Sequence, residues 1–136
     1  MLRRHLLQNA AHAARLIGLY QSADSLEQAA DLATAALDQL HQPIDVLVLG
    51  MGDDGHTASL FPGSANLAHA LREDCPERCV AMHAPVAPEA RLTMTYPLLA
   101  CARMQCLAIQ GSEKLETLRV ALSADPLQMP IRAFLH

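Results

Sequence analysis

The chain has 136 residues, a formal net charge of −4, 51% apolar residues, 3% aromatic residues and no tryptophan. This length fits one domain, over residues 1–136, whose core must be built from Leu, Ala, Val and Met side chains. The negative charge without clustered Lys and Arg argues against nucleic-acid binding, and no apolar run approaches the ~20 residues that cross a bilayer, so we expect a soluble cytoplasmic protein.

The first clear helix signal begins at Ser25. Ser25 and Gln28 have the spacing of a capping box, and Pro43 ends the helical pattern. Apolar residues at steps of four and three then form one buried stripe; they are Leu26, Ala30, Ala33, Leu37 and Leu40. Residues 2–7 are also expected to be helical.

A continuous apolar segment, residues 44–49, runs directly into a glycine-rich loop. The loop contains Gly50, Gly52, Asp53, Asp54, Gly55 and His56. Unbroken aliphatic runs are typical of buried parallel strands, and open α/β sheets bind ligands beyond the carboxyl ends of such strands. Glycines there allow positive φ angles or close backbone approach to a ligand. We expect a short helix to follow before Pro62-Gly63, with backbone N–H groups at its start facing an anion or oxyanion.

The rest of the chain alternates between strand and helix patterns. The expected elements are a strand at 79–83, a connector marked by Pro85 and Pro88, an extended segment at 93–95, a helix at 97–102, a buried strand at 105–110, a helix capped by Ser112 to about residue 122, a turn at Asp125-Pro126 and a last short helix. This alternation predicts an α/β fold with parallel pairing and right-handed crossovers.

Cysteines and histidines outside the loop give no convincing metal pattern. The four cysteines are Cys75, Cys79, Cys101 and Cys106. Cys75 and Cys79 have a spacing that a zinc knuckle allows, but Cys101 and Cys106 straddle an expected helix-to-strand junction, so all four are interpreted as buried or incidental thiols, and disulfides are not expected. The histidines other than His56 are interpreted as surface or packing residues; they are His5, His12, His41, His69, His83 and His136. No metal or cofactor is predicted.

Residues 50–63, Gly-Met-Gly-Asp-Asp-Gly-His-Thr-Ala-Ser-Leu-Phe-Pro-Gly, strongly resemble the signature of 6-phosphogluconolactonases, the soluble lactonases of the pentose phosphate pathway. Glucosamine-6-phosphate deaminases and isomerases of the same superfamily share the Gly-x-Gly-x-Asp-Gly-His core, but residues 57–63 favour the lactonase branch. Shorter similarities to the family lie at 2–7, 91–95, 97–99, 110–114 and 130–135. The resemblance implies a Rossmann-like three-layer sandwich with a mostly parallel sheet, incomplete relative to the family.

The family pattern is longer than this chain at both ends. Its N-terminal part carries a Gly-Gly-Ser/Thr phosphate loop and an Asp-Glu-Arg-like segment, and its C-terminal part carries a further strand and a tryptophan-containing tail. Neither end is present in the sequence. We therefore expect a fragment or truncated gene product, a single partial domain.

The resemblance implies hydrolysis of 6-phospho-D-glucono-1,5-lactone to 6-phosphogluconate. Histidine suits the general base, because an imidazole with an ordinary pKa of ~6.5 is mostly neutral at cytoplasmic pH. His56 is the expected base, and backbone N–H groups of Gly52 or Gly55 are candidate oxyanion donors. A carboxylate from Asp54 or Asp53 is expected to orient the ring, with Asp54 preferred because the family signature keeps Asp directly before Gly-His. Arg91 and Lys114, cations at predicted strand ends, are expected to hold the phosphate. The full set of expected substrate-binding residues is Gly52, Asp53, Gly55, Thr57, Arg91 and Lys114.

Two alternatives stay open at this point. A sugar-phosphate isomerase or deaminase would use the aspartate to move a proton on an aldose or ketose. A non-catalytic remnant without the phosphate loop would bind a sugar phosphate or a partner chain without turnover. Exposed sheet edges also predict poor solubility for the isolated chain, and the oligomeric state stays open.

Overall fold

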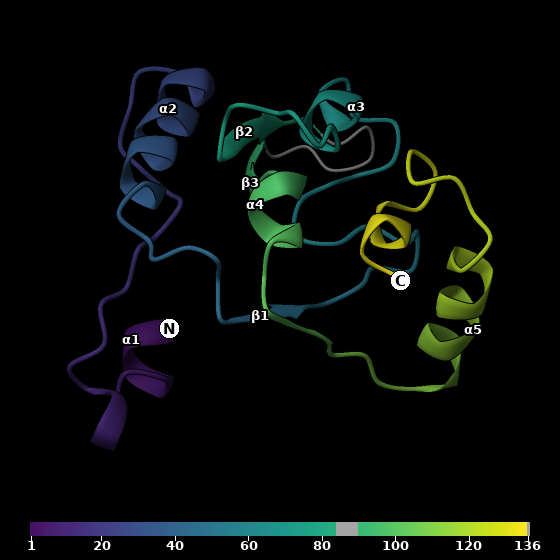
Figure 1. Cartoon of the computed structure of the whole chain (residues 1–136), viewed down its shortest axis with the longest axis horizontal. Helices are drawn as coiled ribbons and strands as arrows, with labels where there is room; N and C mark the ends of the chain where they lie inside the picture. The colour runs from purple at the N-terminus through teal and green to yellow at the C-terminus, as the bar shows by residue number, and fades with distance from the viewer. Residues whose placement is uncertain (84–89, 136) are drawn as a thin grey trace.

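The computed structural model describes residues 1–83 and 90–135 and contains two short sheets (Figure 1). In the first, β1 (Val46–Leu49) pairs in parallel with β4 (Met104–Leu107), from Val46 opposite Met104 to Leu49 opposite Leu107. In the second, β2 (Cys79–Met82) pairs antiparallel with β3 (Arg91–Met94). The expected parallel pairing is therefore confirmed for β1 and β4 and wrong for β2 and β3. The Pro85 and Pro88 connector lies outside the described residues.

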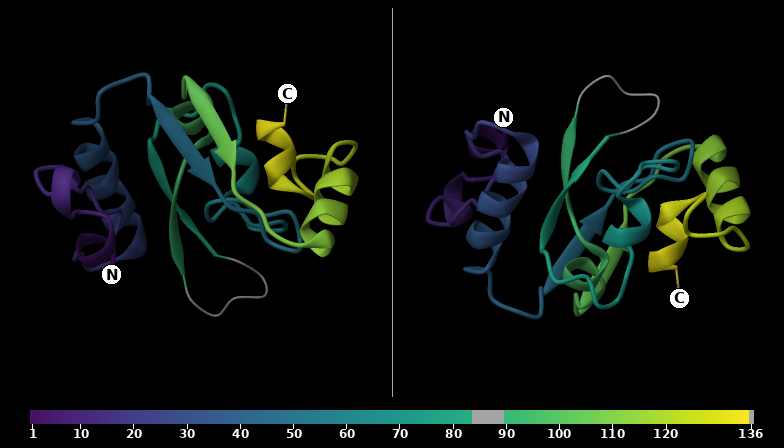
Figure 2. Two further views of the ribbon diagram at one scale, coloured as in Figure 1. Left: turned by 90° about the horizontal axis from the view of Figure 1, so that it is seen from below. Right: turned by 90° about the horizontal axis from the view of Figure 1, so that it is seen from above.

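Helices lie on both sides of the strands. They are α1 (Leu2–His5), α2 (Leu26–Leu37), α3 (Leu67–Ala70), α4 (Tyr96–Ala100) and α5 (Ser112–Ala121), with 3-10 helices η1 (Asn9–Ala11) and η2 (Pro130–Phe134). Figure 2 shows α2 on one side of the strands and α5 with η2 on the other. The expected three-layer α/β arrangement is confirmed. Within the described ranges, no helix has the length and apolar character needed to span a bilayer.

Helix α2 forms where the capping pattern predicts it. The Gln28 amide donates to Ser25 Oγ at 3.1 Å, and the Gln28 side chain accepts from the Asp24 amide at 2.8 Å. Ala33 and Leu37 are buried against the β2–β3 hairpin. Thr34 adds two polar contacts, because its hydroxyl donates to the Cys79 carbonyl and accepts from the Cys79 amide. Helix α2 is thus fixed to β2.

The β1–β4 sheet is buried on one face only. Leu47 and Leu49 are 7% and 6% exposed, whereas Val46 and Val48 are 55% and 65% exposed. Met104 of β4 lies opposite Val46 and is 57% exposed. The expectation that both strands would be buried is therefore wrong. The reason is that α2, in the described structure, packs against the hairpin instead of this face.

This apolar face predicts association between copies of the isolated chain. Contiguous exposed apolar surface promotes association because burying it is favourable. We expect wild-type chain to elute from a sizing column above monomer size, and Val48→Lys to shift it toward the monomer. Leu127 is also exposed, with an exposed fraction of 47%, but it lies outside the sheet. Leu127→Lys should therefore leave the elution unchanged. Monomeric wild-type protein at all concentrations would contradict the prediction.

Two local predictions near the loop and α5 are wrong. Residues 57–61 form no helix; instead the Leu60 amide donates to the Thr57 carbonyl at 2.9 Å, and Ala58 has a φ of 52°. A left-handed residue interrupts a right-handed helix. The N-cap of α5 is Gly111, with a φ of 95° and no side-chain cap, and Ser112 is the first helical residue.

The main core joins β1 to the helices around it. Leu60 and Leu99 are fully buried, together with Met82 of β2. Truncating Leu99 to alanine removes buried methyl groups and leaves a cavity, so we expect the free energy of unfolding to fall by about 2–5 kcal/mol. Urea denaturation measures the change. Leu122→Ala, at a residue 57% exposed, is the control and should change the free energy by less than about 0.5 kcal/mol.

Candidate active site

The glycine-rich loop leaves the carboxyl end of β1 and closes on itself within a few residues. The Gly52 amide donates to the His56 carbonyl at 2.9 Å, and the Gly55 amide donates to the Gly52 carbonyl at 3.1 Å. The Thr57 hydroxyl donates to the Gly50 carbonyl at 2.8 Å. These bonds fix the path of the loop and place His56 beyond the end of the strand.

Gly52 lies directly beneath the catalytic candidates. A Cβ atom built on Gly52 would collide with Nδ1 and Cε1 of the His56 ring and would lie 2.6 Å from Asp54 Oδ1. Only a residue without a side chain lets both groups occupy these positions. The close approach predicted for the loop glycines is thus an approach to His56 itself.

Gly55 is held from the other side by the C-terminal segment. It has a φ of 75°, and an added Cβ would lie 2.8 Å from Cβ and Cε of Met129. The Ile131 amide donates to the Gly55 carbonyl at 2.9 Å. The segment leading into η2 therefore supports the loop, a role for Met129 and Ile131 that no sequence pattern indicated, because the contact joins residues far apart in the chain.

Asp54 and His56 form a close pair. Asp54 Oδ1 lies 2.6 Å from His56 Nδ1 and also accepts from the His56 amide at 3.1 Å. A carboxylate only accepts hydrogen bonds, so Nδ1 carries the proton and Nε2 keeps its lone pair. The His56 side chain is 31% exposed. The pair thus presents a basic nitrogen at the surface of the loop.

The environment keeps Asp54 ionised. Partial burial opposes the charged form, but hydrogen bonds from the His56 amide and ring, with the attraction of that ring, hold the pKa of Asp54 below its ordinary value. An ionised Asp54 is the form that fixes the ring tautomer. The Phe61 ring, with its centroid 4.5 Å from that of His56, packs against the imidazole.

Lys114 lies beside the same loop. It is in the first turn of α5, its side chain is 26% exposed, and its ammonium group forms an ion pair with Asp53. Strand β4 and Gly111 bring the start of α5 to this position. The structure therefore brings two of the expected substrate-binding residues, Asp53 and Lys114, together with each other.

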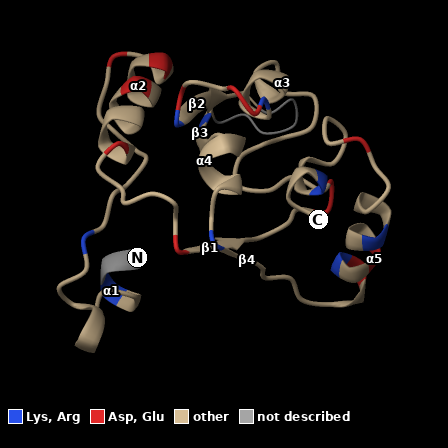
Figure 3. Ribbon diagram, viewed as in Figure 1, with Lys and Arg blue, Asp and Glu red and all other residues tan. Residues whose placement is uncertain are grey.

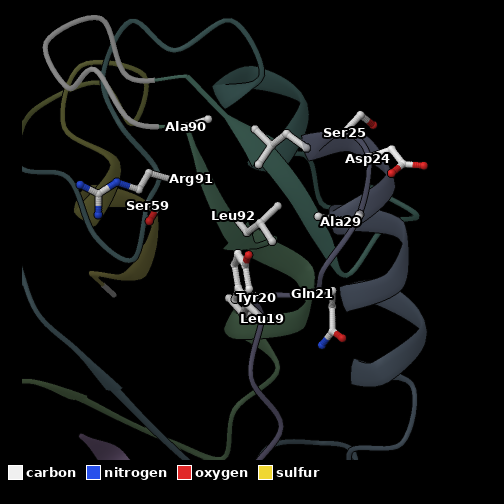
Figure 4. A pocket seen from close by; sticks show the side chains of 12 residues that line it. Leu19, Tyr20, Gln21, Asp24, Ser25, Ala29, Ser59, Ala90, Arg91 and Leu92 are labelled. Carbon is white, nitrogen blue, oxygen red and sulfur yellow. The ribbon is translucent and has the colours of Figure 1, made fainter.

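Arg91, the other expected phosphate-binding cation, is the first residue of β3. It lines a cavity of about 570 Å³ with Ser59, which belongs to the segment that follows His56. Figure 4 shows Arg91 and Ser59 in this cavity, with Leu19 and Tyr20 from the N-terminal part of the chain. His56 does not line it. Arg91 therefore shares this cavity with Ser59, three residues after His56.

Two expectations about the loop change. The Gly52 and Gly55 amides already donate hydrogen bonds to carbonyl groups within the loop, so neither is free to stabilise an oxyanion in this conformation. Because residues 57–61 form no helix, no helix dipole assists these amides. Thr57 is 1% exposed and its hydroxyl holds the loop; its contact with a substrate stays a prediction.

A family model described as "Glucosamine-6-phosphate isomerases/6-phosphogluconolactonase" matches residues 1–136. The chain is 57% identical to a 6-phosphogluconolactonase of Pseudomonas aeruginosa over 137 residues, which cover 100% of this chain and 58% of that protein. It is 46% identical to a 6-phosphogluconolactonase of Rhizobium meliloti, covering 97% of this chain and 57% of the relative.

Solved structures give the same result. The crystal structure of a 6-phosphogluconolactonase from Shewanella baltica superposes with a TM-score of 0.92 at 42% identity, covering 98% of this chain and 57% of that one. The chain thus spans between half and two thirds of the length of the relatives that it matches.

Proposed function

The chain belongs to the family of glucosamine-6-phosphate isomerases and 6-phosphogluconolactonases, and on this basis we propose that it hydrolyses 6-phospho-D-glucono-1,5-lactone to 6-phosphogluconate. The observation that carries the proposal is the Asp54–His56 pair at the carboxyl end of β1, with Nε2 available as a base. Phosphorylated sugars are charged and are retained inside cells, so the proposed activity also implies a cytoplasmic location.

The proposed reaction begins with a water molecule beside Nε2 of His56. The imidazole takes a proton from this water while the oxygen attacks the lactone carbonyl carbon, giving a tetrahedral intermediate. Asp54 stabilises the imidazolium and holds its orientation. When the intermediate collapses, the bond to the ring oxygen breaks, and the imidazolium returns the proton to that oxygen. The products are a carboxylic acid and a free hydroxyl, with no other reactant.

Lys114 is the proposed phosphate contact on the α5 side. Its ammonium group is held next to the loop by Asp53, and a sugar phosphate that carries two negative charges would replace Asp53 as its partner. Arg91 and Ser59 are proposed to contact the substrate from the β3 side, and the remaining loop residues Gly52, Gly55 and Thr57 are proposed to shape the site.

Replacing Lys114 with methionine should raise KM by about 10- to 100-fold, because a charge-assisted bond to phosphate contributes about 1.5–3 kcal/mol. Because the phosphate is remote from the reacting carbonyl, kcat should fall less. Steady-state kinetics on the lactone measures both. Lys114→Arg should restore most of the affinity, and Arg119→Met, on the exposed side of α5, should behave as wild type. An unchanged KM in Lys114→Met would remove Lys114 from the site.

The function itself is tested by adding the purified chain to freshly prepared lactone and following acid release against the spontaneous rate. An enzyme accelerates release in proportion to its concentration. Ammonia or ketose formation from glucosamine 6-phosphate would instead identify the isomerase or deaminase activity. Binding of 6-phosphogluconate without any acceleration would identify a non-catalytic sugar-phosphate-binding chain.

A further inference from the structure

Three potential metal ligands meet between α3 and β2, away from the glycine-rich loop. His69 is on α3, Cys75 is in the connection that follows, and Glu77 lies just before β2. His69 Nε2 is 2.9 Å from Glu77 Oε2, Cys75 Sγ is 3.3 Å from the same oxygen, and Cys75 Sγ is 3.6 Å from Nε2. Sequence patterns indicated a surface or packing role for His69 and a buried or incidental thiol at Cys75; the irregular spacing gave no sign that the two residues converge.

The three donor atoms, His69 Nε2, Cys75 Sγ and Glu77 Oε2, are separated by nearly the distances found in a zinc site. Tetrahedral zinc with ordinary bonds to sulfur, nitrogen and oxygen separates its ligand atoms by about 3.3–3.6 Å. Two of the three separations fall in this range. The third, between His69 and Glu77, would have to open by about 0.4 Å. Small side-chain rotations are therefore sufficient to admit an ion.

Hydrogen bonds to the backbone around the three residues hold these donors in place before any ion binds. The Cys75 amide donates to the Arg72 carbonyl at 3.2 Å, and the Thr95 hydroxyl donates to the Glu77 carbonyl at 2.7 Å. The Asn66 side chain donates to the Ala81 carbonyl at 2.9 Å and ties the start of α3 to β2. Preorganised donors lower the entropy lost on binding.

Charge and access also fit a divalent cation. A Cys75 thiolate and a Glu77 carboxylate together balance two positive charges, and the nearby Arg72 guanidinium is already paired with Asp74. Figure 3 shows acidic and basic positions interspersed along the connection between α3 and β2. The His69 and Glu77 side chains are 41% and 42% exposed, so an ion can enter from solvent and keep a water as its fourth ligand, while Cys75 lies buried behind them.

We propose that His69, Cys75 and Glu77 bind one Zn²⁺ ion that joins α3 to the start of β2. A thiolate, an imidazole and a carboxylate form a donor set suited to zinc. Binding forms three bonds to the metal and releases the thiol proton of Cys75 to solvent. The proposal is independent of lactone hydrolysis, because none of the three residues belongs to the glycine-rich loop.

Cobalt is a spectroscopic probe of this site. We expect Co²⁺ added to the metal-free 136-residue chain to give a thiolate-to-metal charge-transfer band that saturates at one equivalent, and Zn²⁺ to remove it. Cys75→Ser should abolish the band and weaken Zn²⁺ binding at least about 100-fold in competition with a chromophoric chelator, and His69→Gln should weaken it at least about tenfold.

Matched controls use the same residue types at exposed positions elsewhere. Cys106→Ser and His41→Gln should bind cobalt and zinc as wild type does. Circular dichroism checks folding, and His69→Gln, at a half-exposed residue, serves if the buried Cys75→Ser variant unfolds. A wild-type chain that gives no charge-transfer band, or a band and zinc affinity that His69→Gln leaves unchanged, would overturn the proposal and leave a hydrogen-bonded triad.

Discussion

Replacing His56 with alanine is expected to reduce the rate of lactone hydrolysis above the spontaneous background by about 100- to 10,000-fold, the usual contribution of a general base. The reason is geometric: Asp54 fixes the proton on Nδ1, so Nε2 is the ring nitrogen left to accept a proton from water. Initial rates at saturating lactone, with the background subtracted, measure the effect on kcat.

Two further variants separate chemistry from folding. His41→Ala removes an exposed imidazole outside the site and should leave the rate unchanged. Asp54→Asn keeps the shape of the side chain but loses the charge that orients the ring, so its rate should fall between wild type and His56→Ala. Equal rates for wild type and His56→Ala, with both chains folded, would remove His56 from the mechanism.

The charge on Asp54 limits how pH acts on this pair. Because its folded-state pKa lies below the ordinary value of 3.8, the pair stabilises the fold at any pH above that value, and this contribution is lost only as the pH falls through the lower folded-state pKa. Both side chains are partly exposed, so the contribution to stability is small. A loss of activity at mildly acidic pH therefore would not come from protonation of Asp54.

Local patterns in the sequence predicted the elements that depend on neighbouring residues. The cap at Ser25 and the apolar strand before the loop depend on residues a few positions apart, and both are present. The helix end expected at Pro43 was wrong, because α2 already ends at Leu37 and Leu40 lies outside it. The contact between Asp54 and His56 was also predictable, because the two residues are two positions apart in one turn.

Features that depend on distant segments were predicted poorly. Val46 and Val48 are as apolar as buried strand residues, but their exposure depends on where α2 packs. The antiparallel pairing of β2 and β3 could not be read from the order of elements alone. Similarly, the contact between Lys114 and Asp53 joins distant segments whose spacing carries no periodic signal. His69 and Cys75 are only six residues apart, but they converge through an irregular turn that follows neither a helix nor a strand period.

The role of Gly52 was predicted only in part from the sequence. Its position in a glycine-rich loop predicted close approach of something to the backbone, and a ligand was the natural expectation. The structure shows that the approaching groups are the His56 ring and the Asp54 carboxylate. The glycine is therefore required by the arrangement of the catalytic candidates, which makes it a test of that arrangement.

Gly52→Ala is expected to lower kcat by about 100-fold or more while leaving the fold intact. The new methyl group would overlap His56 Nδ1 and Cε1 and would lie 2.6 Å from Asp54 Oδ1, so the ring must swing away and the 2.6 Å contact between Nδ1 and Oδ1 must break. A displacement of about 1 Å at a reacting group can cost about 100-fold in rate. The atoms that must move are side-chain ends, so the urea midpoint should change little.

Gly50→Ala is the matched control, two residues earlier in the same loop. A Cβ atom there meets nothing within 4 Å, so the variant adds the same methyl group and the same loss of backbone freedom without touching His56. Wild-type activity in Gly50→Ala with a strong loss in Gly52→Ala would attribute the effect to the displaced ring. If both variants kept full activity, the geometry of the Asp54–His56 pair would not be what the reaction uses; if both lost it equally, general flexibility of the loop would explain the loss instead.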